Sequence, residues 1–346
     1  MSGSSLDGLD IAYVHLQSGA GKWGYTLVDA ETLPYPVVWQ SRLDQARSLD
    51  ALEYLVLDQE YGRFIGEQVN AFIAARDLDF QVQLVASHGH TVFHFPARAM
   101  TAQLGNGGAI AGITGLQVVT DLRALDVALG GQGAPIVPIG ERWLFPEYAY
   151  FLNLGGIANV SDAASGLAWD VCPANRVLNL LAAEKGEPFD GDGALAASGK
   201  VLPSLLEALE GPAYYAQAAP KSLDNAFGLE QFRLIRQSGC SVADGLRTYV
   251  EHIALQVGEA LRDRPGGDML VTGGGAHNAF LVERLRVALE PIRMVIPEAG
   301  VVDFKEALVV ALFGILRLRQ EENTLASVTG ASRNSIGGAL WNGGEA

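Results

Sequence analysis

The sequence predicts an α/β protein of two domains, each built on a mixed β-sheet flanked by helices. The chain has 346 residues, more than a single hydrophobic core usually holds. Apolar, strand-like segments alternate with segments of helical periodicity, and the order of strands first and helices afterwards occurs twice. We therefore expect domains at 1–135 and 136–324, with the C-terminal segment 325–346 joined to the first domain.

The first half supplies the elements of the first domain. Its strand segments are apolar runs or alternate between apolar and polar residues, and its helix segments carry apolar residues three and four positions apart. The expected elements are, in order, strands at 9–16 and 22–30, a helix at 51–76, a strand at 82–87, a short helix near 107–114 and a strand at 116–123. The glycine-rich segment "ALGGQGAP" at 128–135 then marks a domain border.

The second half repeats this order. The expected elements are, in order, a strand within 148–162 that ends in Gly-Gly, a strand at 166–171, a helix opening at Pro173, a long helix near 242–263, a strand at 268–275, a helix near 278–289, a strand at 292–297 and a helix at 303–320. We expect the chemistry at the carboxyl ends of the strands, because open α/β sheets bind their ligands there.

Composition and charge exclude several classes of protein. Lysine and arginine number 24 against 39 aspartates and glutamates, a net charge of −15 without a basic cluster, so nucleic acid and anionic membranes are not expected partners. The longest apolar run, 307–316, is too short to span a bilayer. The start of the chain lacks the pattern of a secretory signal, and two cysteines build no disulfide framework, so we expect a cytoplasmic protein.

A polar turn opens the chain in "MSGSSLDGLD". Glycine backbone and serine hydroxyls can donate to phosphate oxygens, whereas carboxylates suit Mg²⁺ or its water ligands. The residues expected around a nucleotide here are Ser2, Gly3, Ser4, Ser5, Leu6, Asp7, Gly8 and Asp10, with Asp7 and Asp10 holding the Mg²⁺. The alternative is an ordinary turn rich in serine, aspartate and glycine.

Two further apolar strands end in glycines. Gly155 and Gly156 lie in "NLGGIAN", and Gly273, Gly274 and Gly275 lie in "VTGGGAHN", where a helix follows. One such ending is usually a turn, but three in one chain favour a nucleotide held across a cleft, because glycine loops and helix N-termini bind anions. The sequence has neither a P-loop nor the glycine spacing of a dinucleotide-binding fingerprint.

Eight motifs follow one another from residue 1 to about 331: "MSGSSLDGLD", "SHGHTVFHFP", "DLRALDVALGGQGAP", "NLGGIAN", "WDVCPAN", "FDGDGALAASGK", "VTGGGAHN" and "SVTGA". In this order they resemble the family of 1,6-anhydro-N-acetylmuramic acid kinases, sugar kinases of the actin and hexokinase superfamily. The resemblance implies two ribonuclease-H-like (actin/hexokinase-type) domains with an interdomain cleft. The first would be an ATPase and sugar-binding domain, and the second a nucleotide-binding domain.

The resemblance also implies a reaction with ATP and Mg²⁺ as cofactors and a small amino sugar as substrate. Water would open the 1,6-anhydro bond, and O6 would be phosphorylated to give N-acetylmuramic acid 6-phosphate in peptidoglycan recycling. A homodimer is an expected assembly. The hydrolysis needs a carboxylate that takes a proton from the water attacking C1. The family's base falls on Asp170 of "DVCPAN", where a helix cap is the alternative role.

This motif departs from the family pattern Asp-Thr-Gly-Pro-x-Asn. Val171 and Cys172 stand where Thr and Gly are usual, which leaves open another sugar kinase of the same fold. Cys172 is not expected to be a nucleophile, because its sequence neighbours include a carboxylate and no cation to lower its pKa. Asn175, which ends the motif, is an expected substrate-binding residue.

The segment "SHGHTVFHFP" holds His88, His90 and His94, a composition that raises the alternative of a zinc site. No further ligand stands at zinc spacing, and the resemblance makes this segment the sugar-binding end of a strand. His88 and Thr91 match the family's Ser-His-Gly-Gln-Thr, and His90 replaces its glutamine. We expect His88, His90 and Thr91 to bind the substrate.

In "DLRALD", Asp121, Arg123 and Asp126 match the family's Asp-Phe-Arg-x-x-Asp. Arg123 is expected to bind the lactyl carboxylate of the substrate, since a guanidinium pairs bidentately with carboxylates. The alternative is a structural ion pair with one of the two aspartates, and both roles hold if the acids orient the arginine. Glu306 matches a family Glu-Ala and is a further expected substrate-binding residue, whereas Asp190 of "FDGDG" is expected to be structural.

A catalytically impaired nucleotide-binding homologue is the remaining alternative. Family members usually carry an apolar strand ahead of Met-Ser-Gly-Thr-Ser, and Ser4 replaces the threonine here. Without that strand, the segment 9–16 would lack one ladder partner and the polar turn would be anchored on one side. A translation start upstream of Met1 is the more ordinary explanation, and it predicts an in-frame apolar segment there.

Overall fold

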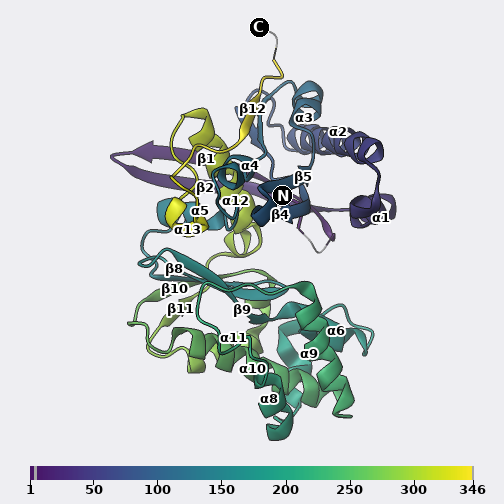
Figure 1. Cartoon of the computed structure of the whole chain (residues 1–346), viewed down its shortest axis with the longest axis vertical. Coiled ribbons are helices and arrows are strands. Elements are labelled where there is room, and N and C mark those ends of the chain that lie inside the picture. The colour runs from purple at the N-terminus through teal and green to yellow at the C-terminus, as the bar shows by residue number, and fades with distance from the viewer. Residues whose placement is uncertain (4–5, 345–346) are drawn as a thin grey trace. The chain divides into compact units, whose positions relative to one another are not determined.

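A computed structural model describes residues 1–3 and 6–344, and the chain divides into two compact units. Unit 1 comprises Met1–Phe145 together with Phe304–Ala346, and unit 2 comprises Pro146–Asp303. Each unit contains a mixed β-sheet and several helices (Figure 1), which confirms the predicted α/β class.

The strands of unit 1 form two antiparallel hairpins and one mixed sheet. They are β1 (Gly8–Gly19), β2 (Lys22–Pro34), β3 (Leu84–Ala86), β4 (His90–Phe95), β5 (Met100–Leu104), β6 (Gln117–Thr120) and β12 (Ala339–Trp341). β1 pairs with β2, β4 pairs with β5, and the mixed sheet has the order β12-β6-β3. The strand predicted at 116–123 ends earlier, because Asp121 takes a left-handed backbone conformation with φ 55°.

The helices of unit 1 follow from caps and apolar periodicity. They are α1 (Val37–Gln45), α2 (Ala51–Ala75), α3 (Gly107–Thr114), α4 (Ala124–Ala128), α5 (Val137–Leu144), α13 (Ala326–Thr329) and the part of α12 (Ala299–Leu318) that starts at Phe304. The Asp50 side chain caps α2 by accepting from the backbone N–H of Glu53. Leu57, Tyr61 and Ile65 are buried along one face of α2, which fits their spacing of four.

The C-terminal segment belongs to unit 1, and the borders between the units differ from the predicted ones. β12 pairs with β6, so the yellow C-terminal chain lies against N-terminal elements in Figure 1. The glycine-rich segment 128–135 stays inside unit 1, and α5 after it packs on β2. The second border falls at Phe304, where the backbone of α12 is non-helical with φ −117° and ψ 16°.

Unit 2 is built on a five-stranded mixed sheet. Its strands, in spatial order, are β11 (Arg293–Val295), β10 (Asp268–Thr272), β7 (Tyr150–Leu154), β8 (Ile157–Asp162) and β9 (Leu167–Pro173). β10 runs parallel to both β11 and β7, whereas β8 is antiparallel to β7 and β9. β7 and β10 therefore end at the same edge of the sheet.

Helices complete unit 2 around a core centred on α10. They are α6 (Asn175–Ala183), α7 (Ala194–Ser198), α8 (Pro203–Glu210), α9 (Asn225–Gln237), α10 (Val242–Leu261) and α11 (Ala279–Ala288). α10 contacts α6, α7, α8, α11 and β9. The Asp190 carboxylate accepts from the backbone N–H groups of Leu195 and Ala196 at the start of α7, which is the structural role expected for it. In residues 1–3 and 6–344, no helix has both the length and the apolar character needed to cross a membrane.

Candidate active site

The predicted sugar-binding residues of unit 1 lie in and after the turn between β3 and β4. Gly89 in this turn has φ 68°, and a Cβ there would stand 2.2 Å from the backbone oxygen of Leu104, so only glycine fits. Its neighbours His88 and His90 are both buried. Thr91 follows in β4, opposite Gln103 of β5. The turn thus holds two imidazoles in the interior of unit 1.

Ser2 of the polar turn is held against His90. The Ser2 hydroxyl and His90 Nδ1 are hydrogen-bonded at 3.1 Å, and the Tyr35 hydroxyl donates to Ser2 Oγ at 2.8 Å. Tyr35 is in turn bonded to the hydroxyl of Tyr61 on α2. Burial lowers the pKa of His90, which favours the neutral imidazole. This chain of contacts joins a predicted nucleotide residue to a predicted sugar residue, two positions 88 residues apart.

Arg123 is directed at His88. Its Nε donates to His88 Nε2 at 2.9 Å, while His88 Nδ1 donates to the backbone oxygen of Gly89 at 3.0 Å. Burial, aided by the charge of Arg123, lowers the pKa of His88 to about 3, so this imidazole is neutral at physiological pH. The two bonds define its tautomer, with the proton on Nδ1.

A braced loop holds Arg123 from its other side. Arg123 Nη1 donates to the backbone oxygen of Gly133 at 2.7 Å. The buried carboxylate of Asp126 accepts from the Gly133 N–H and from the Thr329 hydroxyl, both at 2.7 Å. Among the described residues, neither Asp126 nor Asp121 forms an ion pair with Arg123. Asp126 therefore orients the arginine through Gly133.

The remaining predicted residues of the polar turn lie at the start of β1. Gly8 begins the strand, and its N–H donates to Asp7 Oδ1 at 3.0 Å. Leu6 has φ 57°, and its N–H reaches the backbone oxygen of Gly3 at 3.5 Å, which closes the turn. Asp10 Oδ1 accepts from the Thr32 hydroxyl of β2 at 2.6 Å. Ser4 and Ser5 lie outside the described residues.

Glu306 lies at the surface of α12 in unit 1. The Glu306 side chain is exposed. Its charge affects the pKa of the Met1 ammonium and the pKa of Arg123, which are both distant in the sequence. Burial lowers the pKa of the Met1 ammonium and the pKa of Arg123, and the carboxylate of Glu306 opposes both shifts. The carboxylate of Glu306 is thus close enough to Arg123 to act on its pKa, although a long stretch of sequence separates the two residues.

In unit 2, the two glycine-ended strands lie side by side. β7 and β10 are parallel neighbours, and Thr272 pairs with Asn153 directly before the turns at Gly155–Gly156 and Gly273–Gly275. A 3₁₀ turn, Gly274–His277, continues from β10. Backbone N–H groups in such glycine turns can face an anion at close range. The arrangement brings the two glycine turns together at one edge of the sheet, where the Gly273 N–H donates to the backbone oxygen of Val302 at 3.0 Å.

Asn175, the first residue of α6, holds the β7–β8 turn in place. Its Nδ2 donates to the backbone oxygen of Leu154 at 2.9 Å, and its backbone N–H donates to the oxygen of Gly155 at 3.1 Å. The neighbouring Ala174 N–H donates to the oxygen of Gly156 at 2.8 Å. In the structure, Asn175 therefore fixes the β7–β8 turn through these bonds. The substrate contact predicted for Asn175 would be an additional role.

Gly273→Ala is expected to destabilise unit 2 by about 1–3 kcal/mol. Gly273 has φ 84° and ψ 158°, and a Cβ there would stand 2.5 Å from Asn153 Oδ1 and 2.9 Å from the carbonyl carbon of Leu154. Gly274→Ala is the matched control, because its Cβ would meet only Asn175 Nδ2, at an ordinary 3.7 Å. Urea unfolding of the two variants measures the difference, and equal midpoints would contradict the assigned strain.

Asp170 lies on β9, opposite Asn159 of β8. Its Oδ2 accepts from the backbone N–H of Leu223 at 2.9 Å, and its own N–H donates to the oxygen of Lys221 at 3.0 Å. Burial raises the pKa of Asp170, and the bond from Leu223 opposes this rise. A half-buried carboxylate with one oxygen fixed and an elevated pKa is suited to accept a proton.

Val171 and Cys172, where the sequence departs from the family pattern, belong to the hydrophobic core of unit 2. Burial raises the pKa of the Cys172 thiol well above its usual range, which agrees with the expectation that it is not a nucleophile. The departures therefore alter core packing next to Asp170.

Several residues around these sites have no sequence signal. Tyr35 and Tyr61 join the network of Ser2 and His90, and the segment 221–223 brackets Asp170 with backbone groups only. The tyrosine hydroxyls meet because a β-strand end and a helix face come together, which residue spacing does not reveal. Thr329 of "SVTGA" had a signal as a family motif, and the structure shows its bond to Asp126.

The family model and the relatives that match this chain carry the same family name. The family model described as "Anhydro-N-acetylmuramic acid kinase" matches residues 1–343. A protein of that name from Paramagnetospirillum magneticum is 35% identical, with 98% of this chain and 97% of the relative covered. Another from Shewanella loihica is 32% identical, covering 99% of this chain and 97% of the relative.

Among solved structures, a ROK family glucokinase from Streptomyces griseus in complex with glucose and AMPPNP has 12% sequence identity and a TM-score of 0.38. The comparison covers 88% of this chain and 99% of that chain.

Proposed function

The chain belongs to the anhydro-N-acetylmuramic acid kinase family, and from this premise we propose the roles of its residues in an ATP-dependent reaction that opens and phosphorylates 1,6-anhydro-N-acetylmuramic acid. The protein is a kinase by this membership. Residue roles, Mg²⁺ and the coupling of hydrolysis to phosphorylation form the proposal. The observation that carries it is the half-buried carboxylate of Asp170, with its raised pKa, on the same sheet as two adjacent glycine turns.

Asp170 is the general base in this proposal. Its free oxygen takes a proton from the water that attacks C1, while the bond from the Leu223 N–H holds the other oxygen in place. The C1–O6 bond of the anhydro ring breaks, and O6 becomes the acceptor of the phosphoryl group. Asn175 holds the β7–β8 turn near the end of the strand that carries Asp170.

Arg123 binds the lactyl carboxylate of the sugar. Its Nε and Nη1 are engaged by His88 and Gly133, so the plane of the guanidinium is fixed before the substrate arrives. A preorganised cation loses little conformational freedom on binding. His88, neutral and of fixed tautomer, supports Arg123, and His90 and Thr91 provide further polar groups of the same turn.

The glycine turns of unit 2 and the polar turn of unit 1 are the proposed nucleotide-binding elements. Carboxylate oxygens are the ligands that Mg²⁺ prefers, so Asp7 and Asp10 fit its donor chemistry. Over the described chain, no group of three or more His, Cys, Asp or Glu side chains could hold a metal by itself. When Mg·ATP is bound, ATP would supply the phosphoryl group, and Mg²⁺ would neutralise negative charge on the phosphate oxygens.

A cytoplasmic location and a homodimer complete the proposal. ATP as the phosphoryl donor and two free cysteines, Cys172 and Cys240, suit a reducing compartment. Nucleic acid and membranes are not among the proposed partners, given the net charge of −15.

The test is ADP release measured with a panel of sugars. We expect turnover with 1,6-anhydro-N-acetylmuramic acid, with a product that has gained one water and one phosphoryl group by mass spectrometry. Turnover on reducing sugars alone would replace this function by that of another sugar kinase. The burial of Val171 and Cys172 gives that second candidate no direct support, because neither side chain is exposed to a ligand.

A further inference from the structure

The irregular segment 211–224, which joins α8 to α9 in unit 2, lies along β9 at Asp170. β9 is at the edge of the five-stranded sheet, and the segment pairs with both backbone groups of Asp170 there. The Tyr214 hydroxyl donates to the Asp170 backbone oxygen at 2.7 Å, and the Asp170 N–H donates to the backbone oxygen of Lys221 at 3.0 Å. The Leu223 N–H donates to the carboxylate at 2.9 Å. One segment thus binds the backbone and the side chain of the proposed base.

The ammonium of Lys221 closes this segment on itself. Its Nζ donates to the backbone oxygens of Tyr214 at 3.1 Å and Tyr215 at 3.2 Å, and it lies 4.6 Å from the centre of the Tyr214 ring. An irregular segment loses conformational entropy when it is ordered, and hydrogen bonds from a charged donor are among the strongest that can offset this loss. Lys221 therefore supplies bonds that keep Tyr214 and Leu223 together on the same strand.

Both ends of the segment are fixed to helices of unit 2. Before Lys221, the Tyr215 hydroxyl is hydrogen-bonded to Nε2 of the buried His252 on α10 at 3.0 Å. After Lys221, the Asp224 carboxylate caps α9 by accepting from the N–H of Phe227 at 2.9 Å. The helices hold the two ends, and Lys221 links them.

The bond from Leu223 affects both the orientation and the proton affinity of the Asp170 carboxylate. It fixes Oδ2, so the proposed proton transfer from water goes to the other oxygen. Burial raises the pKa of Asp170, and this bond opposes the rise. Loss of the bond would therefore let the carboxylate turn and would raise its pKa further.

We propose that Lys221 is a positioning residue for Asp170, because its ammonium closes the segment 214–223 and so keeps the Leu223 N–H against the carboxylate. The bonds that the ammonium makes go to carbonyl oxygens of the segment itself, so Lys221 acts through the segment. This inference rests on the general-base role proposed above for Asp170. In that proposal, Lys221 itself binds neither the sugar nor the nucleotide.

The ionisable groups around Asp170 leave it as the group of this cluster that titrates on the acid side. Burial raises the pKa values of Tyr214 and Cys172, so both stay protonated at and below neutral pH. Burial lowers the pKa of His252 to about 3, so its imidazole is neutral. Burial also lowers the pKa of Lys221, which starts from an alkaline value. Within this cluster, the acid limb of the pH profile, where kcat/KM falls with pH, therefore reports Asp170.

The test begins with Lys221→Met, whose side chain has a similar length but neither charge nor donor. Its kcat should fall by about 10- to 100-fold, the effect of a misplaced catalytic group, while the KM for the sugar stays unchanged. The acid limb should move to higher pH by about 0.5–1 unit, the equivalent of one hydrogen bond. Lys221→Arg keeps the charge and the donors and should restore most of the rate.

Tyr214→Phe tests the segment without changing the charge. It removes the hydroxyl that donates to Asp170 but keeps the ring and the ammonium of Lys221. Its acid limb should move in the same direction as that of Lys221→Met, by a smaller amount. Amide exchange of the peptide covering 211–224 should be about ten-fold faster than in the parent protein for both variants.

A double variant shows whether Lys221 acts through the base. Lys221→Met combined with Asp170→Asn should be no slower than Asp170→Asn alone, because a positioning residue has no effect on the rate without the group that it positions. A role in stability alone would instead slow both backgrounds equally.

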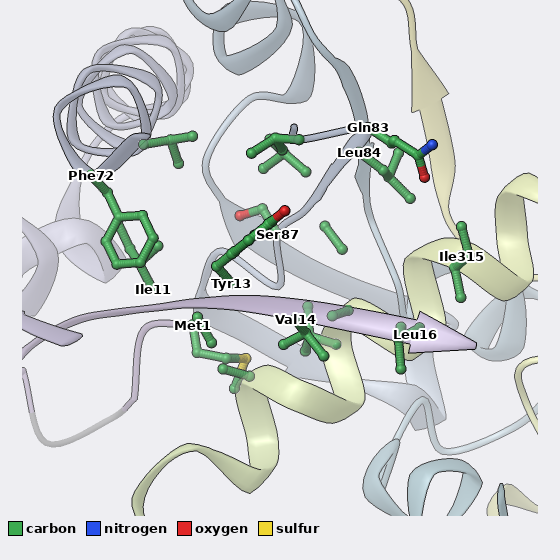
Figure 2. A pocket seen from close by; sticks show the side chains of 18 of the residues that line it. Met1, Ile11, Tyr13, Val14, Leu16, Phe72, Gln83, Leu84, Ser87 and Ile315 are labelled. Atoms are coloured by element: carbon green, nitrogen blue, oxygen red, sulfur yellow. The ribbon is translucent and has the colours of Figure 1, made fainter. Parts of the chain in front are cut away.

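Two control variants lower stability without touching the segment. Arg264→Gln breaks the ion pair with the buried Asp162 of β8, in the same sheet as Asp170. Phe72→Leu removes atoms from the wall of a cavity of about 460 Å³ in unit 1, which Phe72 lines (Figure 2). Both should lower the melting temperature and keep the pH profile of the parent protein.

Four results would each overturn the inference: an unchanged acid limb in Lys221→Met, a shift there without one in Tyr214→Phe, the same shift in a control, or a double variant slower than Asp170→Asn alone. The second of these would assign the effect to the charge of the ammonium. All four leave the general base in place as long as Asp170→Asn is slow. Near-normal turnover of Asp170→Asn would remove the base and this inference together.

Discussion

Asp170→Asn is expected to lower kcat by about 10²- to 10⁴-fold, the usual contribution of a general base. The amide cannot take a proton from water, but its oxygen can still accept from the Leu223 N–H that holds the carboxylate at 2.9 Å. The fold of β9 should therefore be kept. ADP release at saturating sugar and ATP measures the loss.

Two controls separate this loss from damage to the site. Mg·ATP affinity by calorimetry should be unchanged, because the glycine turns keep their backbone bonds. In the parent protein, kcat/KM should fall as the pH drops through the raised pKa of Asp170, since the base must be ionised to act. The residual activity of the variant should lack this fall. A variant with near-normal turnover would remove Asp170 from the catalytic role.

Arg123→Ala is expected to raise KM for the anionic sugar by about 10- to 100-fold, the equivalent of one charge-assisted interaction. The guanidinium is held by His88 and Gly133, so a charge fixed in one orientation is lost. Arg123→Lys should recover only part of the affinity, because an ammonium lacks the planar fork that pairs with a carboxylate. Initial rates over a range of sugar concentrations measure both variants.

The decisive control for Arg123 is a substrate without the carboxylate. With 1,6-anhydro-N-acetylglucosamine, which lacks the lactyl group, the parent protein and Arg123→Ala should have similar kcat/KM values. An equal loss on both sugars would mean that Arg123 supports the turn around His88 and does not bind the carboxylate. The KM for ATP should not change in either case.

Regular elements with strong patterns could be predicted closely from the sequence. β1, α2 and α10 lie within a few residues of their expected ranges, because apolar periodicity and the caps at Asp50 and Ser241 are local signals. The β4–β5 hairpin was not predicted, since Pro96 and a run of mixed polarity hide its alternation. Local patterns therefore predict an element well when its apolar residues recur at the spacing of a helix or a strand.

The glycine-rich segment shows where local reasoning fails. Five of the eight residues at 128–135 are glycine or alanine, which suggests a flexible border, yet the loop is fixed by the carboxylate of Asp126 and the hydroxyl of Thr329. These partners are 203 positions apart. Only the fold brings them together, so composition alone could not place the border.

The residues of the candidate site could be predicted from the sequence, but the contacts between their side chains could not. Family motifs indicated His88, Arg123 and Asp170, but no motif indicates that Arg123 donates to His88 or that Asp126 acts through Gly133. The same holds for Ser2 and His90, which meet because β1 and the β3–β4 turn come together. Side-chain partners depend on the packing of whole elements, which spacing along one strand does not determine.

The discontinuity of unit 1 has a consequence for biosynthesis. Unit 2 is one uninterrupted stretch, Pro146–Asp303, so its last residue is translated before Phe304–Ala346 completes unit 1. At about 5–20 residues per second, the ribosome needs several further seconds to add α12 and β12. During that time the edge of β6 that later pairs with β12 is open. Unit 2 has then been translated completely, whereas unit 1 still lacks its C-terminal residues. Chaperones that protect open strand edges are expected to bind the first half of this protein during its synthesis.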